Sequence, residues 1–336
     1  MDTIDVLIDT DNALGTLESD PEDGLAIVMA IQSPELRVRA VTGVFGNCRL
    51  ESVIANTTML LREVGRPDIP FAAGFDAPLL PGHPAGHPSP AHERDAQLVE
   101  GGARPDRHAV DVIIETALAS TTGLTLIGLG PLTNIAVAVR REPRLRDYVR
   151  EIVVMGGGHR ETNVTPAAEF NFWADPDSAH IVFESGLPIR MVGLDVCHRV
   201  NLAEDDLSAL RAGGNLGTLA ARCFDSLWWS PIYLYDTLTV AAAANPELLQ
   251  CMPALVEIQR DHTASFGQSL VYWRNVRSNA KVAYRVDSEA FKALFRERVL
   301  APLSAGGSVD WGLALEGPER LATLPSAPTR DGIQNG

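Results

Sequence analysis

The chain has 336 residues, of which 46% are hydrophobic and 21% are charged, and its net charge is −15 at neutral pH. This hydrophobic content supports a large buried core and excludes an intrinsically disordered chain. The acidic balance disfavours nucleic acid as a partner, because a phosphate backbone requires basic surfaces. Apolar runs stay shorter than the roughly 20 residues of a membrane span, so we expect no membrane partner.

Cysteine usage and the start of the chain favour a cytoplasmic protein. The four cysteines are widely spaced and form no CxxC pair, which is typical of reduced thiols in a cytosolic protein. The first apolar run begins almost at once and leaves no room for a signal peptide. We therefore expect a soluble protein of the cytoplasm.

Short apolar runs alternate with helical patterns along the chain, which is typical of parallel α/β sheets. Strands are predicted at 4–8, 38–44, 124–128, 151–155 and 189–194. Helices are predicted at 23–32, 50–64, 109–120, 132–140, 176–185, 204–212, 216–228 and 236–244. The fold class expected is α/β, with an open, mostly parallel, Rossmann-like sheet flanked by helices in one domain over 1–321.

Three segments depart from this alternation. The Pro-rich stretch within about 76–108 predicts a surface loop or lid, because prolines interrupt both helices and strands. The Val-rich and aromatic tract 253–286 suggests an accessory hairpin. The end of the chain, 322–336, has the composition of a flexible tail.

Acidic residues gather after the first predicted strand. The strand delivers Asp9 and Asp11 to its carboxyl end, where α/β sheets bind ligands, and Asp20, Glu22 and Asp23 open the next helix. Such carboxylates repel one another, and a hard cation such as Ca²⁺ or Mg²⁺ relieves the repulsion. Alternatively, the second group caps the helix, since acids favour its N-terminus. The cluster alone leaves both interpretations open.

Other polar residues also follow predicted strands or open helices. They are Asn47, Asn134, Asn163, Glu169, Asn171, Asp175 and Asp236. Glycines flank Leu129 and would leave its carbonyl free to face a ligand, and another glycine run follows Met155. Taken singly, the asparagines and aspartates have a simpler interpretation as helix caps, and the glycines as turns.

In this order the motifs resemble the inosine–uridine-preferring nucleoside hydrolase family, the calcium-dependent N-ribohydrolases. The resemblance runs from about Ile4 to at least Pro246, with weaker matching beyond. The matching blocks are Asp9-Thr10-Asp11, Glu22-Asp23-Gly24-Leu25-Ala26, Gly46-Asn47, the stretch from Gly128 to Ala136, Met155-Gly156-Gly157, Asn163, Ala168-Glu169-Phe170-Asn171, Asp175-Pro176, and Asp236-Thr237-Leu238-Thr239-Val240.

The resemblance implies a nucleoside hydrolase that cleaves the N-glycosidic bond of ribonucleosides to give ribose and free base. Asp11, Asp23, Asp236 and the carbonyl of Leu129 would bind Ca²⁺, and Asp9 would support them from behind. Asp11 would also act as general base on the metal-bound water that attacks the sugar.

The resemblance also implies the substrate contacts and the assembly. The residues expected to bind the ribose are Glu22, Asn47, Met155, Asn163, Glu169, Asn171 and Asp236. The partner expected is a small-molecule nucleoside, and relatives commonly form homodimers or homotetramers.

The chain departs from the family pattern near the substrate. The loop between Asp11 and Glu22 is longer than usual, and Glu22 replaces the first member of an Asp pair, so either Asp20 or Glu22 would meet the ribose. Tyr235 stands where relatives carry the histidine proposed to protonate the leaving base. A second family histidine is replaced at Glu100.

Two compensations for the missing histidine remain open. Aromatic residues could stack on the base, as in purine-specific relatives; the candidates are Trp228, Trp229, Tyr233 and Tyr235. Alternatively, His83, His87 or His92 of the lid segment could donate the proton. Core packing of the tryptophans and a plain loop role for the histidines are the simpler interpretations. Base specificity therefore stays open.

Two rival functions fit parts of the same pattern. Asp9-Thr10-Asp11 could be the DxD nucleophile of a phosphatase. Such an enzyme would also need a lysine in a later strand, but the only lysines are Lys281 and Lys292, both beyond the matching blocks. Alternatively, the chain could be a catalytically altered member that binds ribosides or hydrolyses a non-standard N-riboside. The presence of Asp11, Asp23 and Asp236 together argues against a decayed site, which need not keep its metal ligands.

Overall fold

The computed structural model describes residues 3–80, 96–99, 101–274 and 277–305. The lid histidines His83, His87 and His92, Glu100, and the tail 322–336 lie outside the described residues.

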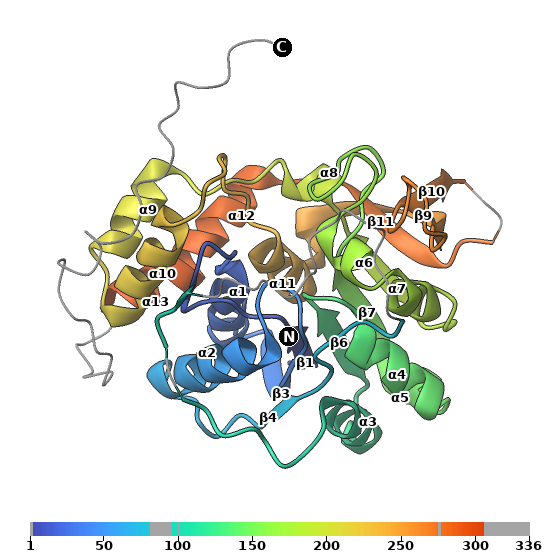
Figure 1. Cartoon of the computed structure of the whole chain (residues 1–336), viewed down its shortest axis with the longest axis horizontal. Helices are drawn as coiled ribbons and strands as arrows, with labels where there is room; N and C mark the ends of the chain where they lie inside the picture. Colours follow the sequence, from blue (N-terminus) through green and yellow to red (C-terminus); the bar gives the residue numbers. More distant parts are fainter. Residues whose placement is uncertain (1–2, 81–95, 100, 275–276, 306–336) are drawn as a thin grey trace, which may run out of the picture.

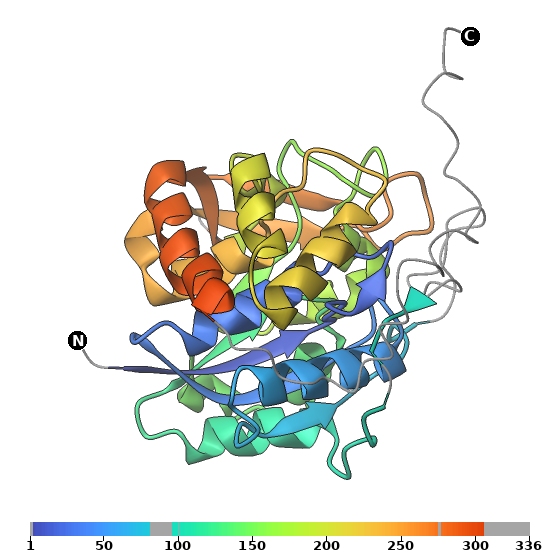
Figure 2. The same cartoon turned by 90° about the vertical axis from the view of Figure 1, so that its left-hand side faces the viewer.

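The main sheet runs through the molecule, and helices cover both of its faces (Figures 1 and 2). In spatial order its strands are β10 (Ser269–Trp273), β9 (Leu249–Ile258), β11 (Ala280–Val286), β8 (Ile189–Val192), β7 (Val149–Met155), β6 (Leu124–Gly128), β1 (Ile4–Thr10), β3 (Leu36–Gly43) and β4 (Phe71–Ala73). From β11 to β4 neighbouring strands are parallel, and β9 pairs antiparallel with β10 and β11. The predicted mostly parallel α/β fold is confirmed.

The five predicted strands correspond to β1, β3, β6, β7 and β8, with ends shifted by a few residues. The tract 253–286 contributes to β9, β10 and β11, which extend the main sheet instead of forming a separate accessory hairpin. Two short strands, β2 (Thr16–Leu17) and β5 (Ala96–Gln97), form a small second sheet. Such short strands carry no alternation from which they could be predicted.

The helices form two layers because successive side chains of β1 point to opposite faces of the sheet. Val6 and Ile8 join the core on one face, with α1, α10, α11 and α12, whereas Leu7 joins the other, with α3, α4 and α7. The helices are α1 (Glu22–Ile31), α2 (Leu50–Glu63), α3 (Ala109–Ala119), α4 (Thr133–Arg141), α5 (Leu145–Tyr148), α6 (Phe170–Ala174), α7 (Pro176–Phe183), α8 (Leu194–Cys197), α9 (Glu204–Arg211), α10 (Asn215–Asp225), α11 (Asp236–Ala244), α12 (Ser288–Phe295) and α13 (Ala301–Ala305).

All eight predicted helices are present, but one ends early. Helix α10 stops at Asp225, so the predicted helix over 216–228 is too long and Trp228 lies beyond its end. The short helices α6 and α8 were not predicted, because four or five residues show no helical period.

The carboxyl ends of β1 and β3 and the segment after β4 are held together by one buried side chain, Asn134 of α4. Its Nδ2 donates to Asp9 Oδ1 (2.8 Å) and to the carbonyl of Gly43 (3.0 Å), and its Oδ1 accepts from the amide of Phe75. Thr42 donates a second hydrogen bond to Asp9. Asn134 is therefore a tie between strand ends, and its interpretation as a helix cap is wrong. Burial raises the pKa of Asp9 to about 7.

No described helix is long and apolar enough to cross a bilayer. The four cysteines form no disulfide bond.

Candidate active site

Three carboxyl groups from distant parts of the sequence meet at the carboxyl edge of the sheet. Asp11 follows β1, Asp23 lies in the first turn of α1, and Asp236 is the first residue of α11. The carboxyl of Asp23 lies within hydrogen-bonding reach of both Asp11 and Asp236. All three residues are buried. Helices α1 and α11 pack against each other, which explains how residues so far apart in sequence converge.

The loops around Asp11 are shaped to its carboxylate. The amide of Asn47 donates to its Oδ2 (2.6 Å). A side chain on Gly46 would place its Cβ 1.9 Å from Oδ2, and one on Gly130 would place its Cβ 2.8 Å from Oδ1. Glycine is therefore required at both positions for the backbone to approach this close. Burial and the neighbouring charge of Asp23 raise the pKa of Asp11 well above its usual range.

Asp23 is satisfied within the protein, whereas its two neighbours are not. Thr10 donates to Asp23 Oδ1 (2.5 Å) and Asn47 Nδ2 donates to its Oδ2 (3.0 Å). By contrast, Oδ1 of Asp11 and Oδ1 of Asp236 are buried and have no hydrogen-bond partner. A buried, unpartnered carboxylate oxygen is costly, so each marks a position where a cation or a donor belongs.

These oxygens are the part of the site that fits a metal ion. Among the described residues, no group of three or more His, Cys, Asp or Glu side chains is arranged to hold one. Even so, the donor set is all-oxygen and acidic, and two of its oxygens are unpartnered. This chemistry suits a hard divalent cation.

Glu22 occupies a different place from that predicted for it. Its carboxylate accepts hydrogen bonds from the backbone amides of Asp236 (2.5 Å) and Thr237 (2.7 Å) at the start of α11. It is buried and caps that helix from a neighbouring one. Burial raises the pKa of Glu22 to about 7, although these amides favour its charged form. Asp20, by contrast, is half-buried and lines the adjacent pocket.

Leu129 and Asn171 build the floor beside the carboxylates. The carbonyl of Leu129 accepts from Asn171 Nδ2 (2.7 Å), and the same amide group donates to the carbonyl of Met155 (3.2 Å). A carbonyl oxygen has two lone pairs, so Leu129 keeps one for a further partner. Asn171 thereby joins the ends of β6 and β7 at the pocket floor.

Glu169 is held by backbone donors. Its Oε1 accepts from the amide of Asn171 and its Oε2 from the amides of Gly157 and Phe172, all at 2.8–3.1 Å. Asn163 accepts from the amide of Phe170 (3.0 Å). Both side chains line the pocket, and each keeps a donor or acceptor that these hydrogen bonds do not use. Burial raises the pKa of Glu169.

A pocket of about 600 Å³ opens above these groups. Its polar part is lined by Asp20, Asn47, Leu129, Met155, Asn163, Glu169, Asn171 and Asp236. Its aromatic part is lined by Phe170, Trp173, His198, Trp228, Trp229, Tyr233 and Tyr235. This volume suits a small organic molecule, and the lining offers it both polar and flat aromatic contacts.

The four aromatic residues singled out in the sequence all reach this pocket. Trp228 and Trp229 pack edge to face, with ring centroids 5.3 Å apart. Trp228 is 84% exposed, so its interpretation as helix core packing is wrong. Tyr233 and Tyr235 lie 6.0 Å apart in a similar arrangement. Burial raises the pKa of Tyr235 far above that of an ordinary phenol.

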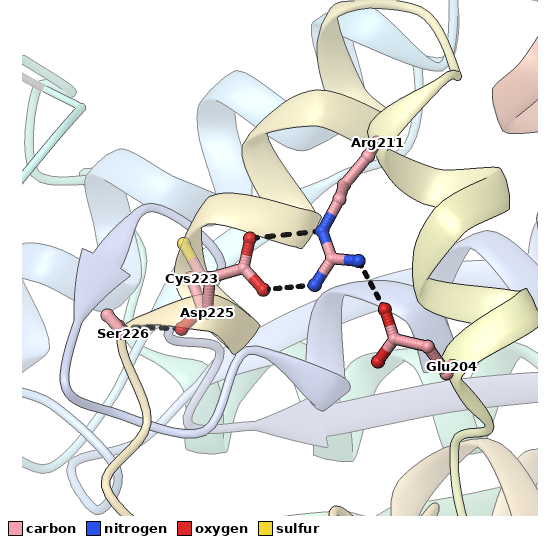
Figure 3. A network of polar contacts seen from close by, with 5 residues as sticks. All are labelled: Glu204, Arg211, Cys223, Asp225 and Ser226. Carbon is pink, nitrogen blue, oxygen red and sulfur yellow. Dashed lines mark hydrogen bonds and ion pairs between the residues drawn. The ribbon is translucent and has the colours of Figure 1, made fainter. Parts of the chain in front are cut away.

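The segment with Trp228 and Trp229 follows α10, and the end of α10 is bonded to the loop between Asp11 and Glu22. Arg211 of α9 makes two hydrogen bonds to Asp225 of α10 and one to Glu204 (Figure 3). This network is exposed and is worth at most about 1 kcal/mol. The adjacent Ser226 accepts from the amide of Glu18 (2.8 Å), which joins the loop before α1 to the end of α10.

His198 is the principal pocket residue that the sequence patterns did not single out. It follows β8 and α8 at the same edge of the sheet, a position that could have drawn attention to it. Its ring stacks on Tyr233, with centroids 4.4 Å apart, and its Nδ1 lies 3.3 Å from Glu161 Oε2. Apart from Glu22, the residues predicted to bind metal, ribose or base lie at the pocket or the carboxylate cluster, whereas Asp175 caps α7 by accepting from the amide of Ser178.

Comparison with known proteins gives a consistent result. The sequence profile described as "Inosine-uridine preferring nucleoside hydrolase" matches residues 6–293. The chain is 32% identical over 306 residues to the pyrimidine-specific ribonucleoside hydrolase of Salmonella gallinarum, covering 84% of this chain and 97% of that enzyme. It is 34% identical over 314 residues to the enzyme of the same description from an Escherichia coli O7:K1 strain, with the same coverage.

Solved structures agree with the sequence comparison. A plant nucleoside hydrolase matches with a TM-score of 0.77 and 30% identity, covering 89% of this chain and 99% of that one. The purine-preferring ribonucleoside hydrolase from Gardnerella vaginalis matches with a TM-score of 0.78 and 25% identity, with the same coverage. The similar proteins thus include enzymes described as pyrimidine-specific and as purine-preferring.

Proposed function

This chain belongs to the inosine-uridine preferring nucleoside hydrolase family, and from that premise we propose that it hydrolyses the N-glycosidic bond of ribonucleosides to ribose and free base. The observation that carries the proposal is the pair of buried, unpartnered oxygens of Asp11 and Asp236. Asp236 and Asn47, whose amide contacts Asp11, both line a pocket whose other lining residues divide into polar and aromatic side chains. A nucleoside has the same division between a hydroxyl-rich sugar and a flat base.

The proposed cofactor is Ca²⁺, held by Asp11, Asp23, Asp236 and the carbonyl of Leu129. The support is an all-oxygen donor set with three carboxyls and unpartnered oxygens, which favours Ca²⁺ over softer metals. When bound, the ion would supply positive charge that activates water and orients the sugar diol.

The protein groups supply the rest of the chemistry. Asp11 accepts the proton of the attacking water as general base, because its carboxylate is held in place by the Asn47 amide. Asn163, Glu169 and Asn171 bind the sugar hydroxyls with their remaining donors and acceptors. The carboxylates stabilise the positive charge that develops on the ribose as the bond to the base breaks.

A release assay tests the proposed reaction. Purified protein with Ca²⁺ is incubated with inosine, adenosine, guanosine, uridine, cytidine and nicotinamide riboside, and reducing sugar and free base are measured. We expect ribose and base from at least one of the six. A protein that binds Ca²⁺ but releases no sugar from any of them would instead be a riboside-binding member of the family.

Asp20, and not Glu22, is proposed to contact the ribose, because only Asp20 lines the pocket. We expect Asp20→Asn to raise KM about tenfold, the effect of losing one charged hydrogen bond, without lowering the unfolding midpoint. We expect Glu22→Ala to lower the free energy of unfolding by about 2 kcal/mol, because two amides of α11 lose their acceptor. Steady-state kinetics and urea unfolding of both variants check this division, and an Asp20→Asn variant with normal KM would refute it.

Cytoplasmic location and a homodimeric or homotetrameric state belong to the same proposal. The location rests on the cysteine usage and the assembly on family resemblance, and light scattering of the purified protein measures the state of assembly.

A further inference from the structure

We propose that His198, oriented by Glu161, protonates the departing base. This inference rests on the proposed hydrolase function and assigns a group that the function requires. Bond cleavage leaves an electron pair on the base nitrogen, and most nucleobases depart readily only when a proton reaches them. General acids contribute about 10²–10⁴-fold to such steps.

Tyr235 is poorly suited to this role although it precedes Asp236. A phenol gives up a proton far less readily than an imidazolium does, because its ordinary pKa is about 10 and that of an imidazolium is about 6.5. Among the described residues that line the pocket, His198 is the only histidine. Its side chain is 14% exposed, which allows contact with a bound molecule while excluding most water.

The position of His198 is set by two aromatic neighbours, Tyr233 and Tyr235. The imidazole stacks on Tyr233 with an interplanar angle of 30° and meets Tyr235 edge-on at 6.0 Å. Tyr233 and Tyr235 also line the pocket. Because a ring held on two sides cannot rotate freely, its nitrogens keep a fixed direction.

Glu161 determines which nitrogen is available. Its Oε2 lies 3.3 Å from Nδ1 of His198, and an ionised carboxylate can only accept, so Nδ1 carries a proton. This leaves Nε2 for the base. The loop that carries Glu161 is fixed to α8: the Asp195 carboxylate accepts from the amides of His159 (2.5 Å) and Arg160 (3.0 Å). His198 directly follows α8, so the same helix holds both the proposed acid, His198, and the residue that orients it, Glu161.

The proposed step balances. The bond between C1′ and the base nitrogen breaks, and its electron pair stays on the base. The Nε2 proton of the His198 imidazolium moves to the base, which leaves as a neutral molecule. Water supplies hydroxide to C1′ and its proton to Asp11. Solvent then removes the proton from Asp11 and returns one to His198, so the sum is nucleoside plus water giving ribose plus base.

The test compares leaving groups that do and do not need a proton. p-Nitrophenyl riboside releases a stable phenolate, so it should bypass the acid. We expect His198→Gln to lower kcat for the best nucleoside at least about 100-fold while changing kcat for p-nitrophenyl riboside less than about threefold. Glu161→Gln should lower nucleoside turnover about tenfold with the same selectivity. His180→Gln, on α7 and away from the pocket, is the matched control and should alter neither substrate.

The outcomes separate this inference from the proposed function. Parallel losses on both substrates in His198→Gln and Glu161→Gln proteins with native unfolding midpoints would overturn the inference, as would unchanged nucleoside turnover. Wild-type protein that cleaves neither nucleosides nor p-nitrophenyl riboside would instead overturn the proposed function.

Discussion

Asp11→Asn should abolish ribose release, with kcat/KM at least about 10³-fold lower than in the wild type. The amide cannot accept a proton from water, and it brings no charge to the carboxylate cluster. In the wild type the amide of Asn47 donates to Asp11 Oδ2 over 2.6 Å. The fold of the variant should survive, because the asparagine side chain keeps an oxygen that can accept this hydrogen bond. It also removes a buried like charge beside Asp23, so the unfolding midpoint should not fall.

The matched control for this substitution is Asp5→Asn. Asp5 is buried near the other end of the same strand, where it pairs with the exposed Arg37, so the control should keep full activity. Turnover of Asp11→Asn within tenfold of the wild type would contradict the role of Asp11 as general base.

Removing divalent cations should abolish activity and lower the unfolding midpoint by about 5 °C. A ligand that binds only the folded state stabilises it by about 2.7 kcal/mol at 100 times its Kd. In this protein the bound cation would also offset the repulsion among Asp11, Asp23 and Asp236, whose pKa values are all raised by burial. Thermal melts and nucleoside turnover after chelation, and again after adding Ca²⁺, measure both effects.

Asp23→Asn provides the control for the cation prediction. Its midpoint should respond to Ca²⁺ far less than that of the wild type, because one of the proposed ligands has lost its charge. Full activity of the wild type in excess chelator would refute the metal requirement.

Much of the sheet and of the site's placement was predictable from local patterns. The apolar run of β1 followed by Asp9 and Asp11, and the glycine-flanked Leu129, each put polar groups at a strand's carboxyl end. Parallel strands bring their carboxyl ends to the same edge of the sheet, so these residues were expected to lie close together. The partner Asp236 could be placed only through family resemblance, since nothing local to α11 shows that it packs on α1.

Other features depend on tertiary contacts that no local pattern encodes. Glu22 and Asp20 are two residues apart, yet Glu22 caps α11 and Asp20 lines the pocket. The end of α10 at Asp225 was missed since its apolar pattern continues into Trp228. His198 was missed because its partners, Glu161 and Tyr233, come from other loops.

The most direct measurement of the central claim is a time course with the best nucleoside in phosphate-free buffer containing Ca²⁺. The account predicts that ribose and free base appear together in a one-to-one ratio until the nucleoside is consumed. Base release that depends on added phosphate, or no release of ribose, would contradict it.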